Sequence, residues 1–112
     1  MMRRVLVLNS DTMGSGDQEL GRRLMVKFVH QLAGLPTLPD GVLFYNTAVR
    51  LLANDSVVVE ALRELERGGV ELLACGTCVE HFKLGNSLGA GRITDMREIA
   101  ATMVTADRVV GV

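Results

Sequence analysis

Apolar residues in this chain follow two patterns that alternate along its length. Unbroken apolar runs are typical of strands covered on both faces of a parallel sheet, whereas apolar residues that recur every three or four positions are typical of helices. The runs that we expect to form strands are 3–8, 42–45, 70–74, a brief segment around Ile93, and 108–112. Right-handed crossovers through the intervening helices then place these strands in one sheet. The pattern predicts an α/β fold: a three-layer α/β/α sandwich with a mainly parallel sheet of about five strands.

Polar residues and glycines predict where the helices begin and end. Ser15, in a capping box with Gln18, and Asp17 are rival N-caps for a first helix that ends at Gly34. The core-facing residues expected on this helix are Leu20, Leu24, Phe28 and Leu32, flanked by Met25 and Val29. Shorter helices are expected after a Ser56 cap and up to Gly68-Gly69, from Val79 to Leu84, and after a capping box of Asp95 and Glu98.

The length and net charge of the chain limit the kinds of protein that it can be. The chain has 112 residues and a net charge of −1, with acids and bases interspersed. This length suits a single domain over 1–112, and a near-neutral chain has no basic surface for nucleic acid or anionic lipid. No apolar run approaches the roughly 20 residues of a membrane-spanning helix. The first apolar run stops at Asn9, too early for a signal peptide, so we expect a cytoplasmic protein that binds neither nucleic acid nor membranes.

Polar turns follow the first three long strands. In open parallel sheets, ligands bind beyond the carboxyl ends of the strands, so loop 9–17, turn 46–47 and turn 75–78 should share one edge. The residues expected to line a pocket there are Asn9, Ser10, Asp11, Gly14, Asn46, Thr47, Gly76 and Thr77. Loop 9–17 lacks the glycine spacings of Walker and Rossmann phosphate loops. A turn that only caps the first helix is an equally good interpretation of it.

The two cysteines of the chain stand together in Cys75-Gly76-Thr77-Cys78. In a cytosolic protein, this pattern indicates redox, sulfur or metal chemistry rather than a disulfide framework. A thiol attacks as the thiolate, which amides at the start of the following helix would stabilise at Cys75 or Cys78. His81 lies on the same helical face as Cys78 and is a candidate proton acceptor. The candidate catalytic residues are therefore Cys75, Cys78 and His81.

Other interpretations of these three residues stay open. A cysteine at a strand end often only packs, and His81 is equally well an ordinary surface histidine. The three have metal-ligand spacing, but a structural zinc takes four protein ligands and His30 lies towards the far end of its helix. We therefore expect no metal and no cofactor. Two functions rival sulfur transfer: a redox protein that forms a Cys75–Cys78 disulfide, and a small-molecule-binding module in which the cysteines only pack.

Several segments together resemble the DsrE-like family. They are Leu8-Asn9-Ser10-Asp11-Thr12-Met13-Gly14, Glu19-Leu20-Gly21, Phe44-Tyr45-Asn46-Thr47, the apolar and acidic pattern of 62–71, and Cys75-Gly76-Thr77-Cys78. The resemblance is strongest to the DsrE-type domain of the YedF group, which is described as sulfurtransferase-like and associated with selenium metabolism. YedF proteins usually carry a TusA-like domain before this one. We expect that domain to be a separate protein or to be dispensable here.

The resemblance implies a function as well as a fold. Relatives pass sulfur between proteins as a cysteine persulfide and assemble into oligomers. The resemblance places the acceptor at Cys75, with Cys78 as the partner thiol, and the dithiol chemistry of Cys-x-x-Cys also favours the first cysteine as nucleophile. We expect a sulfur or selenium relay protein, either a sulfurtransferase or a carrier. It should form a homodimer, trimer or hexamer and exchange sulfur with a TusA-like carrier or a cysteine desulfurase.

Overall fold

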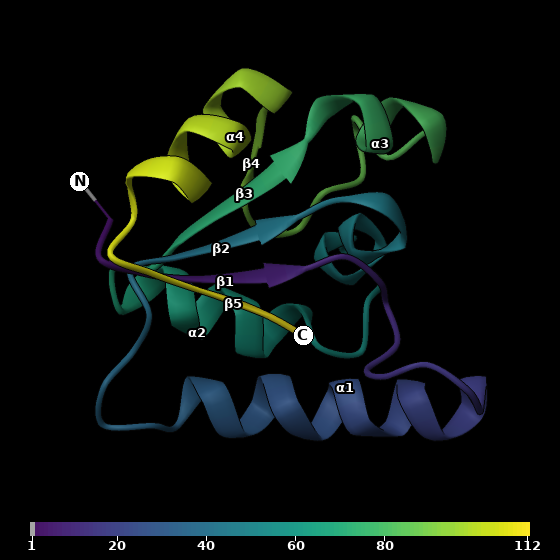
Figure 1. Cartoon of the computed structure of the whole chain (residues 1–112). Helices are drawn as coiled ribbons and strands as arrows, with labels where there is room; N and C mark the ends of the chain where they lie inside the picture. The colour runs from purple at the N-terminus through teal and green to yellow at the C-terminus, as the bar shows by residue number, and fades with distance from the viewer. Residues whose placement is uncertain (1) are drawn as a thin grey trace.

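A five-stranded parallel sheet, in the order β4-β3-β2-β1-β5, is the middle layer of residues 2–112, which the structure describes (Figure 1). The structure is a computed structural model. In chain order its elements are β1 (Arg4–Leu8), α1 (Gln18–Ala33), β2 (Gly41–Phe44), the 3-10 helix η1 (Asn46–Leu52), α2 (Val59–Arg67), β3 (Glu71–Cys75), α3 (Gly76–His81), β4 (Arg92–Thr94), α4 (Met96–Thr105) and β5 (Arg108–Gly111). The predicted α/β fold is confirmed.

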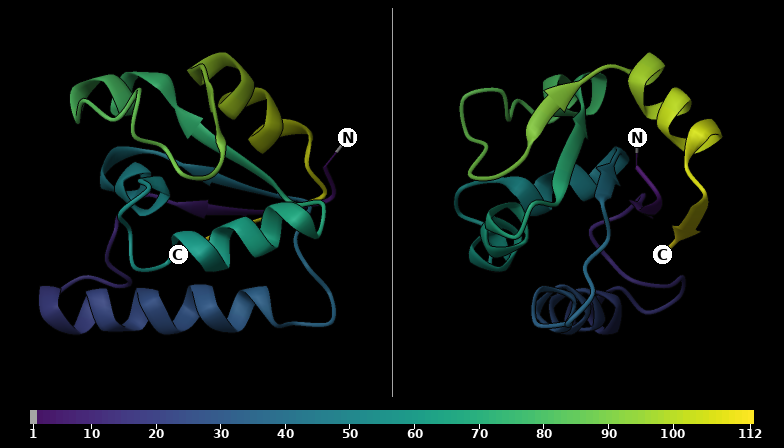
Figure 2. Two further views of the ribbon diagram at one scale, coloured as in Figure 1. Left: turned by 180° about the vertical axis from the view of Figure 1, so that it is seen from behind. Right: turned by 90° about the vertical axis from the view of Figure 1, so that its left-hand side faces the viewer.

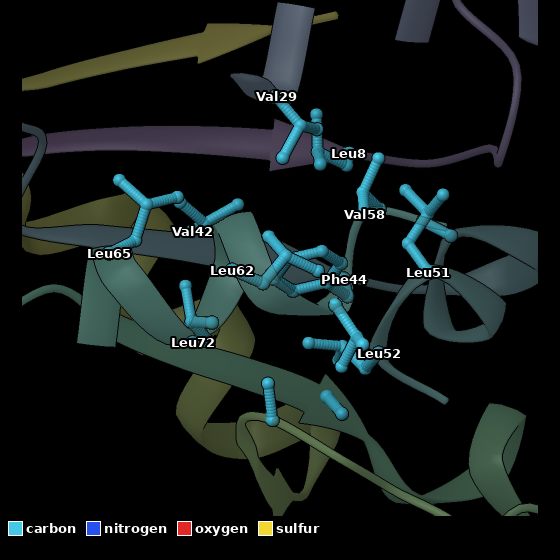
Figure 3. Packing of buried hydrophobic residues seen from close by; sticks show 14 of the residues in the cluster. Leu8, Val29, Val42, Phe44, Leu51, Leu52, Val58, Leu62, Leu65 and Leu72 are labelled. Carbon is cyan, nitrogen blue, oxygen red and sulfur yellow. The ribbon is translucent and has the colours of Figure 1, made fainter. Parts of the chain in front are cut away.

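The two faces of the sheet carry separate apolar cores because successive strand residues point to opposite sides. Leu8 and Phe44 belong to the larger core, under α1 and α2, which Figure 3 shows. Val7 and Leu43 face the other side, where Ile99 of α4 packs on them. Figure 2 shows α1 and α2 below the sheet and α4 above it. The alternation produces the three layers.

The carboxyl ends of the three central strands lie level with one another. Leu8 of β1 pairs with Phe44 of β2, and Phe44 pairs with Ala74 of β3. Loop 9–17, η1 and α3 therefore leave the sheet at the same edge, on the right-hand side of Figure 1. This register brings together segments that lie far apart in the sequence.

The buried face of α1 differs from the predicted one. Asp17 is the N-cap, because its Oδ1 accepts the Leu20 N–H at 2.8 Å, so the Ser15 capping box is wrong. The buried residues are Gly21, Met25, Val29 and Leu32, whereas Leu20 and Leu24 are 50% and 40% exposed. Gly21 explains the offset: a Cβ there would lie 2.9 Å from Cβ of Thr12. The glycine lets the loop before α1 approach this face of the helix.

The shorter helices also differ from the prediction at their boundaries. Ser56 accepts the Val58 N–H at 3.2 Å but precedes the N-cap of α2, which is Val58 itself. The helix expected from Val79 to Leu84 runs instead from Gly76 to His81. It ends early because Lys83 adopts a left-handed φ of 57° and turns the chain.

Two further boundaries complete the comparison with the sequence. The Asp95 cap of α4 is confirmed, since its Oδ1 accepts the Glu98 N–H at 2.9 Å. The 3-10 helix η1 was not predicted; it buries Val49, Leu51 and Leu52 in the larger core.

Within residues 2–112, no helix is both long and apolar enough to cross a membrane.

Candidate functional site

Hydrogen bonds join the turns that leave the sheet at this edge. The Asp11 N–H donates to Oγ1 of Thr47 at 3.1 Å, and the hydroxyls of Thr47 and Ser10 are 3.4 Å apart. The backbone N–H of Asn46 donates to Sγ of Cys78 at 3.0 Å. The turns after β1, β2 and β3 thus form one connected surface, with the Cys78 sulfur at the junction of η1 and α3.

Asn46 holds an unusual backbone conformation where it meets this sulfur. Its φ is 54°, in the left-handed region that few non-glycine residues adopt. Asparagine tolerates this region because its short side chain can bond to nearby backbone. Here its Oδ1 accepts the Thr47 N–H at 2.9 Å. Residues in such conformations tend to occur where the surrounding structure demands them, often at functional sites.

The two cysteines occupy different environments. Cys75 ends β3 and is 1% exposed, packed in the smaller core with Leu73 and Ile99. Cys78 lies in the first turn of α3 and is partly exposed. It packs against both apolar cores at the carboxyl edge of the sheet. Of the two thiols, Cys78 is therefore the one that is accessible from solvent in this structure.

The environment of Cys78 favours its protonated form. Burial raises the pKa of its thiol above the ordinary 9.0, and the neighbouring Cys75 thiol raises it further. The Asn46 N–H acts in the opposite direction and lowers the pKa, because it stabilises the thiolate, without cancelling the effect of burial. The Asn46 N–H is the identified interaction that favours the reactive form.

A small open cavity of about 260 Å³ gives access to Cys78. Its lining residues are Asn46, Thr77, Cys78, His81 and Phe82. His81 is exposed, and its ring meets the Phe82 ring edge to face, with centroids 4.9 Å apart. Four of these residues were among those singled out from the sequence, and Phe82 was not.

Arg50 also belongs to this surface, although nothing in the sequence marked it beyond its being a lone charge in an apolar segment. Its guanidinium carbon lies 4.3 Å from the centroid of the Phe82 ring. The same group forms a 4.0 Å ion pair with Asp11. A cation–π contact near the protein surface contributes about 0.5–1 kcal/mol. Arg50 therefore links the loop after β1 to α3 and places a positive charge beside the cavity.

Loop 9–17 lines a separate cavity of about 530 Å³, next to the end of β5. The residues around it are Asn9, Ser10, Thr12, Gly14, Ser15, Gly16, Asp17, Gln18 and Val112. Three of the pocket residues expected from the sequence, Asn9, Ser10 and Gly14, therefore lie apart from the Cys78 cavity. Asp11 and Thr47 connect the two regions without lining either cavity.

Gly76 sets the approach of β4 to the cysteine turn. A Cβ on Gly76 would lie 3.0 Å from the Thr94 carbonyl oxygen and 3.3 Å from Cγ2 of Ile93. Any side chain would force the edge strand away from α3. A glycine at this position permits the close backbone approach.

No group of three or more His, Cys, Asp or Glu side chains within the described range 2–112 is placed to hold a metal ion. Cys75, Cys78 and His81, which have ligand-like spacing in the sequence, form no such group. The arrangement around Cys78 instead combines a nucleophilic atom, an amide donor and a nearby imidazole. These groups suit chemistry at sulfur.

Comparison with known proteins shows what this fold is similar to. The chain is 22% identical to MTH1491, a protein of unknown function from Methanobacterium thermoautotrophicum, with a TM-score of 0.70 and 98% of each chain covered. It is 19% identical to the ychN protein from E. coli, with a TM-score of 0.67, covering 99% of this chain and all (100%) of that one. BT1422 from Bacteroides thetaiotaomicron, also of unknown function, is 15% identical, with a TM-score of 0.60 over 97% of this chain and 95% of that one.

The family of this chain is assigned from its sequence, not from the structural likenesses. No curated protein is similar enough to count as a match. The specific likeness to YedF stays a prediction. Residues 7–111 match the DsrE/DsrF-like family, and the chain therefore belongs to that family.

Proposed function

We propose that this chain relays sulfur as a persulfide on a cysteine, and that Cys78 is the acceptor. The observation that carries the proposal is the position of the Cys78 sulfur, partly exposed in a cavity and 3.0 Å from the Asn46 N–H. Membership of the DsrE/DsrF-like family, whose relatives handle sulfur, supports the same chemistry. Selenium is a second proposed substrate of the same class, since the Cys78 thiolate can attack the terminal selenium of a donor selenopersulfide while the donor cysteine leaves as a thiolate.

The transfer step needs only the thiolate of Cys78 and a donor persulfide. The thiolate attacks the terminal sulfur of the donor, a new S–S bond forms on Cys78, and the donor S–S bond breaks. The donor cysteine leaves as a thiolate, so no oxidant or reductant is consumed. His81 lines the same cavity and is the proposed acceptor for the proton that Cys78 loses. Discharge repeats the exchange with a second protein's thiolate as the nucleophile.

The acceptor assignment differs from the one that the Cys-x-x-Cys motif favours. A donor protein must bring its persulfide within bonding distance of the nucleophile, and Cys75 is 1% exposed within the smaller core. Cys75 is proposed instead as a buried partner thiol that raises the Cys78 pKa and stands ready to resolve an oxidised Cys78. Its burial protects it from external persulfides.

The proposed partners follow from this chemistry. A cysteine desulfurase is the proposed donor, and a TusA-like carrier the proposed acceptor. A homodimer, trimer or hexamer is also proposed, since apolar side chains remain uncovered at one end of the sheet. Val104 of α4 is 83% exposed, and Val109 and Val110 of the edge strand β5 are 39% and 45% exposed.

Intact mass spectrometry tests the proposal directly. Wild type, Cys78→Ser and Cys75→Ser are incubated with a cysteine desulfurase and cysteine, then measured before and after reduction. A gain of roughly 32 Da, one sulfur atom, that reduction reverses is expected in wild type and Cys75→Ser and not in Cys78→Ser. Absence of the gain in wild type would refute the relay. A gain lost only in Cys75→Ser would return the acceptor role to Cys75.

A dithiol redox function is the second candidate, favoured by the proximity of the Cys75 and Cys78 thiols. In this case the two thiols lose two hydrogen atoms to an oxidant and form a disulfide. The same spectra distinguish it, because a disulfide lowers the mass instead of adding sulfur. A mass unchanged in every variant would leave a binding module, with the cavity of loop 9–17 as its site.

A further inference from the structure

The segment between β2 and η1 is held on both sides of the amide that contacts Cys78. Before it, the Tyr45 N–H donates to the Leu8 carbonyl at 3.2 Å and extends the sheet. After it, Thr47 accepts the Asp11 N–H, and Ala48 is fully buried. The peptide between Tyr45 and Asn46 is held at both of its polar atoms: its carbonyl accepts the Ala48 N–H at 3.3 Å, and its N–H donates to Cys78.

The left-handed φ of Asn46 is what points its N–H at the Cys78 sulfur. With the strand and the 3-10 helix both anchored, a change of φ at Asn46 to a negative value must be absorbed by rotating the peptide that precedes it. That rotation turns the N–H away from the Cys78 sulfur, to which it now donates at 3.0 Å. The φ of 54° and the contact with sulfur are therefore parts of one arrangement.

We propose that the left-handed backbone of Asn46 positions its amide on Cys78 and so sets the reactivity of that thiol. Asn46 is in this sense a positioning residue, and its backbone conformation matters more than its side chain. The proposal rests on the proposed function only in taking Cys78 as the reacting thiol. The side chain contributes indirectly, since the bond from Thr47 N–H to Asn46 Oδ1 stabilises the conformation.

Substitutions of Asn46 by residue types that differ in their tolerance of positive φ separate the effect of its backbone conformation from the effect of its side chain. Asn46→Gly keeps the conformation and the N–H while removing the Oδ1 bond. Asn46→Val keeps the N–H but opposes the conformation, because a β-branched residue at positive φ is a genuine outlier. Asn46→Ala opposes it less strongly and serves if the valine variant does not fold. Circular dichroism and thermal unfolding establish that each variant is folded.

The measurement is the pH dependence of Cys78 alkylation by iodoacetamide, with the modified peptide identified by mass spectrometry. Loss of a hydrogen bond to a thiolate is expected to raise the apparent pKa by about one unit, which lowers the alkylation rate at neutral pH about tenfold. We expect this in Asn46→Val, a loss of about threefold in Asn46→Ala, and a rate within twofold of wild type in Asn46→Gly.

Two results would overturn the inference. Equal rates in all variants would show that the amide contact does not govern the thiol. An equal loss in Asn46→Gly and in the valine or alanine variant would assign the effect to the carboxamide side chain. Alkylation needs no sulfur donor, so these results stand whether or not the wild type accepts sulfur from a desulfurase. Failure of the relay and failure of this inference are therefore distinguishable.

Discussion

Replacing Gly76 by alanine tests how tightly the cysteine turn is built. The new Cβ would lie 3.0 Å from the Thr94 carbonyl oxygen and 3.3 Å from Cγ2 of Ile93. Both belong to β4, an edge strand of three residues that pairs only with β3 in the part of the chain described. A short edge strand moves more easily than a central one, so we expect β4 to shift by a few tenths of an ångström.

The magnitude follows from two opposing effects. Overpacking costs about 1–3 kcal/mol, whereas alanine in a helix is favoured over glycine by up to about 1 kcal/mol. The second effect is small here because Gly76 is the first residue of α3. The expected net loss is about 1–2 kcal/mol in the free energy of unfolding, equivalent to a fall in Tm of roughly 5–10 °C for a chain of this size.

Gly85→Ala is the matched control. A Cβ on Gly85 would meet nothing within 4 Å, and its backbone is not left-handed, so we expect no loss and a gain of up to about 1 kcal/mol. Urea unfolding followed by circular dichroism suits a chain with no tryptophan and one tyrosine. If Gly76→Ala proves as stable as Gly85→Ala, the close approach of β4 to α3 is not a constraint, and the reasoning fails.

Other predictions concern charge, strain and the reactive thiol. Glu98 has its pKa lowered to about 2, because Arg92 and Thr94 bond its carboxylate. The contribution of this ionised carboxylate to the free energy of unfolding is therefore complete above pH 4.5 and is lost as the pH falls towards 2. Because the Glu98 side chain is 40% exposed, this contribution is below about 1 kcal/mol. Glu98→Gln should accordingly make the free energy of unfolding depend less on pH between 4.5 and 2. Lys83→Gly should raise the free energy of unfolding by about 0.5 kcal/mol in urea titrations, because glycine relieves the left-handed φ of 57°. Alkylation of Cys78 should be slow at neutral pH and still accelerate above pH 9.0, since burial raises its pKa; a plateau below pH 8 would contradict this.

The sequence alone determined the fold class and the edge of the sheet at which the candidate site lies. Unbroken apolar runs identify the strands, because a parallel sheet buries both faces of each strand. Once the sheet is parallel, the turns after β1, β2 and β3 must meet at its carboxyl edge. Asn46 and Cys78 could be placed near each other on this argument, and so could His81 and Thr77.

Which face of α1 is buried could be identified only from the tertiary structure. Leucine spacing along α1 pointed to Leu20 and Leu24, but the helix buries the face that contains Gly21 and Met25. A hydropathy pattern does not register that glycine lacks a side chain. The close packing of Thr12 against Gly21 requires this face of the helix to point inwards. The contact between Arg50 and Phe82 was similarly invisible, since these residues come from different elements.

The difference in exposure between the two cysteines is the main point that only the tertiary structure decided. The spacing Cys75-Gly76-Thr77-Cys78 indicates sulfur chemistry but does not say which thiol faces solvent. That depends on where β3 ends relative to the core beneath α4, which buries Cys75, and on the start of α3, which carries Cys78 to the surface. The Asn46 N–H reaches Cys78 for the same reason: strand register and a left-handed backbone, both set by packing, bring an amide 32 positions earlier in the chain to the sulfur.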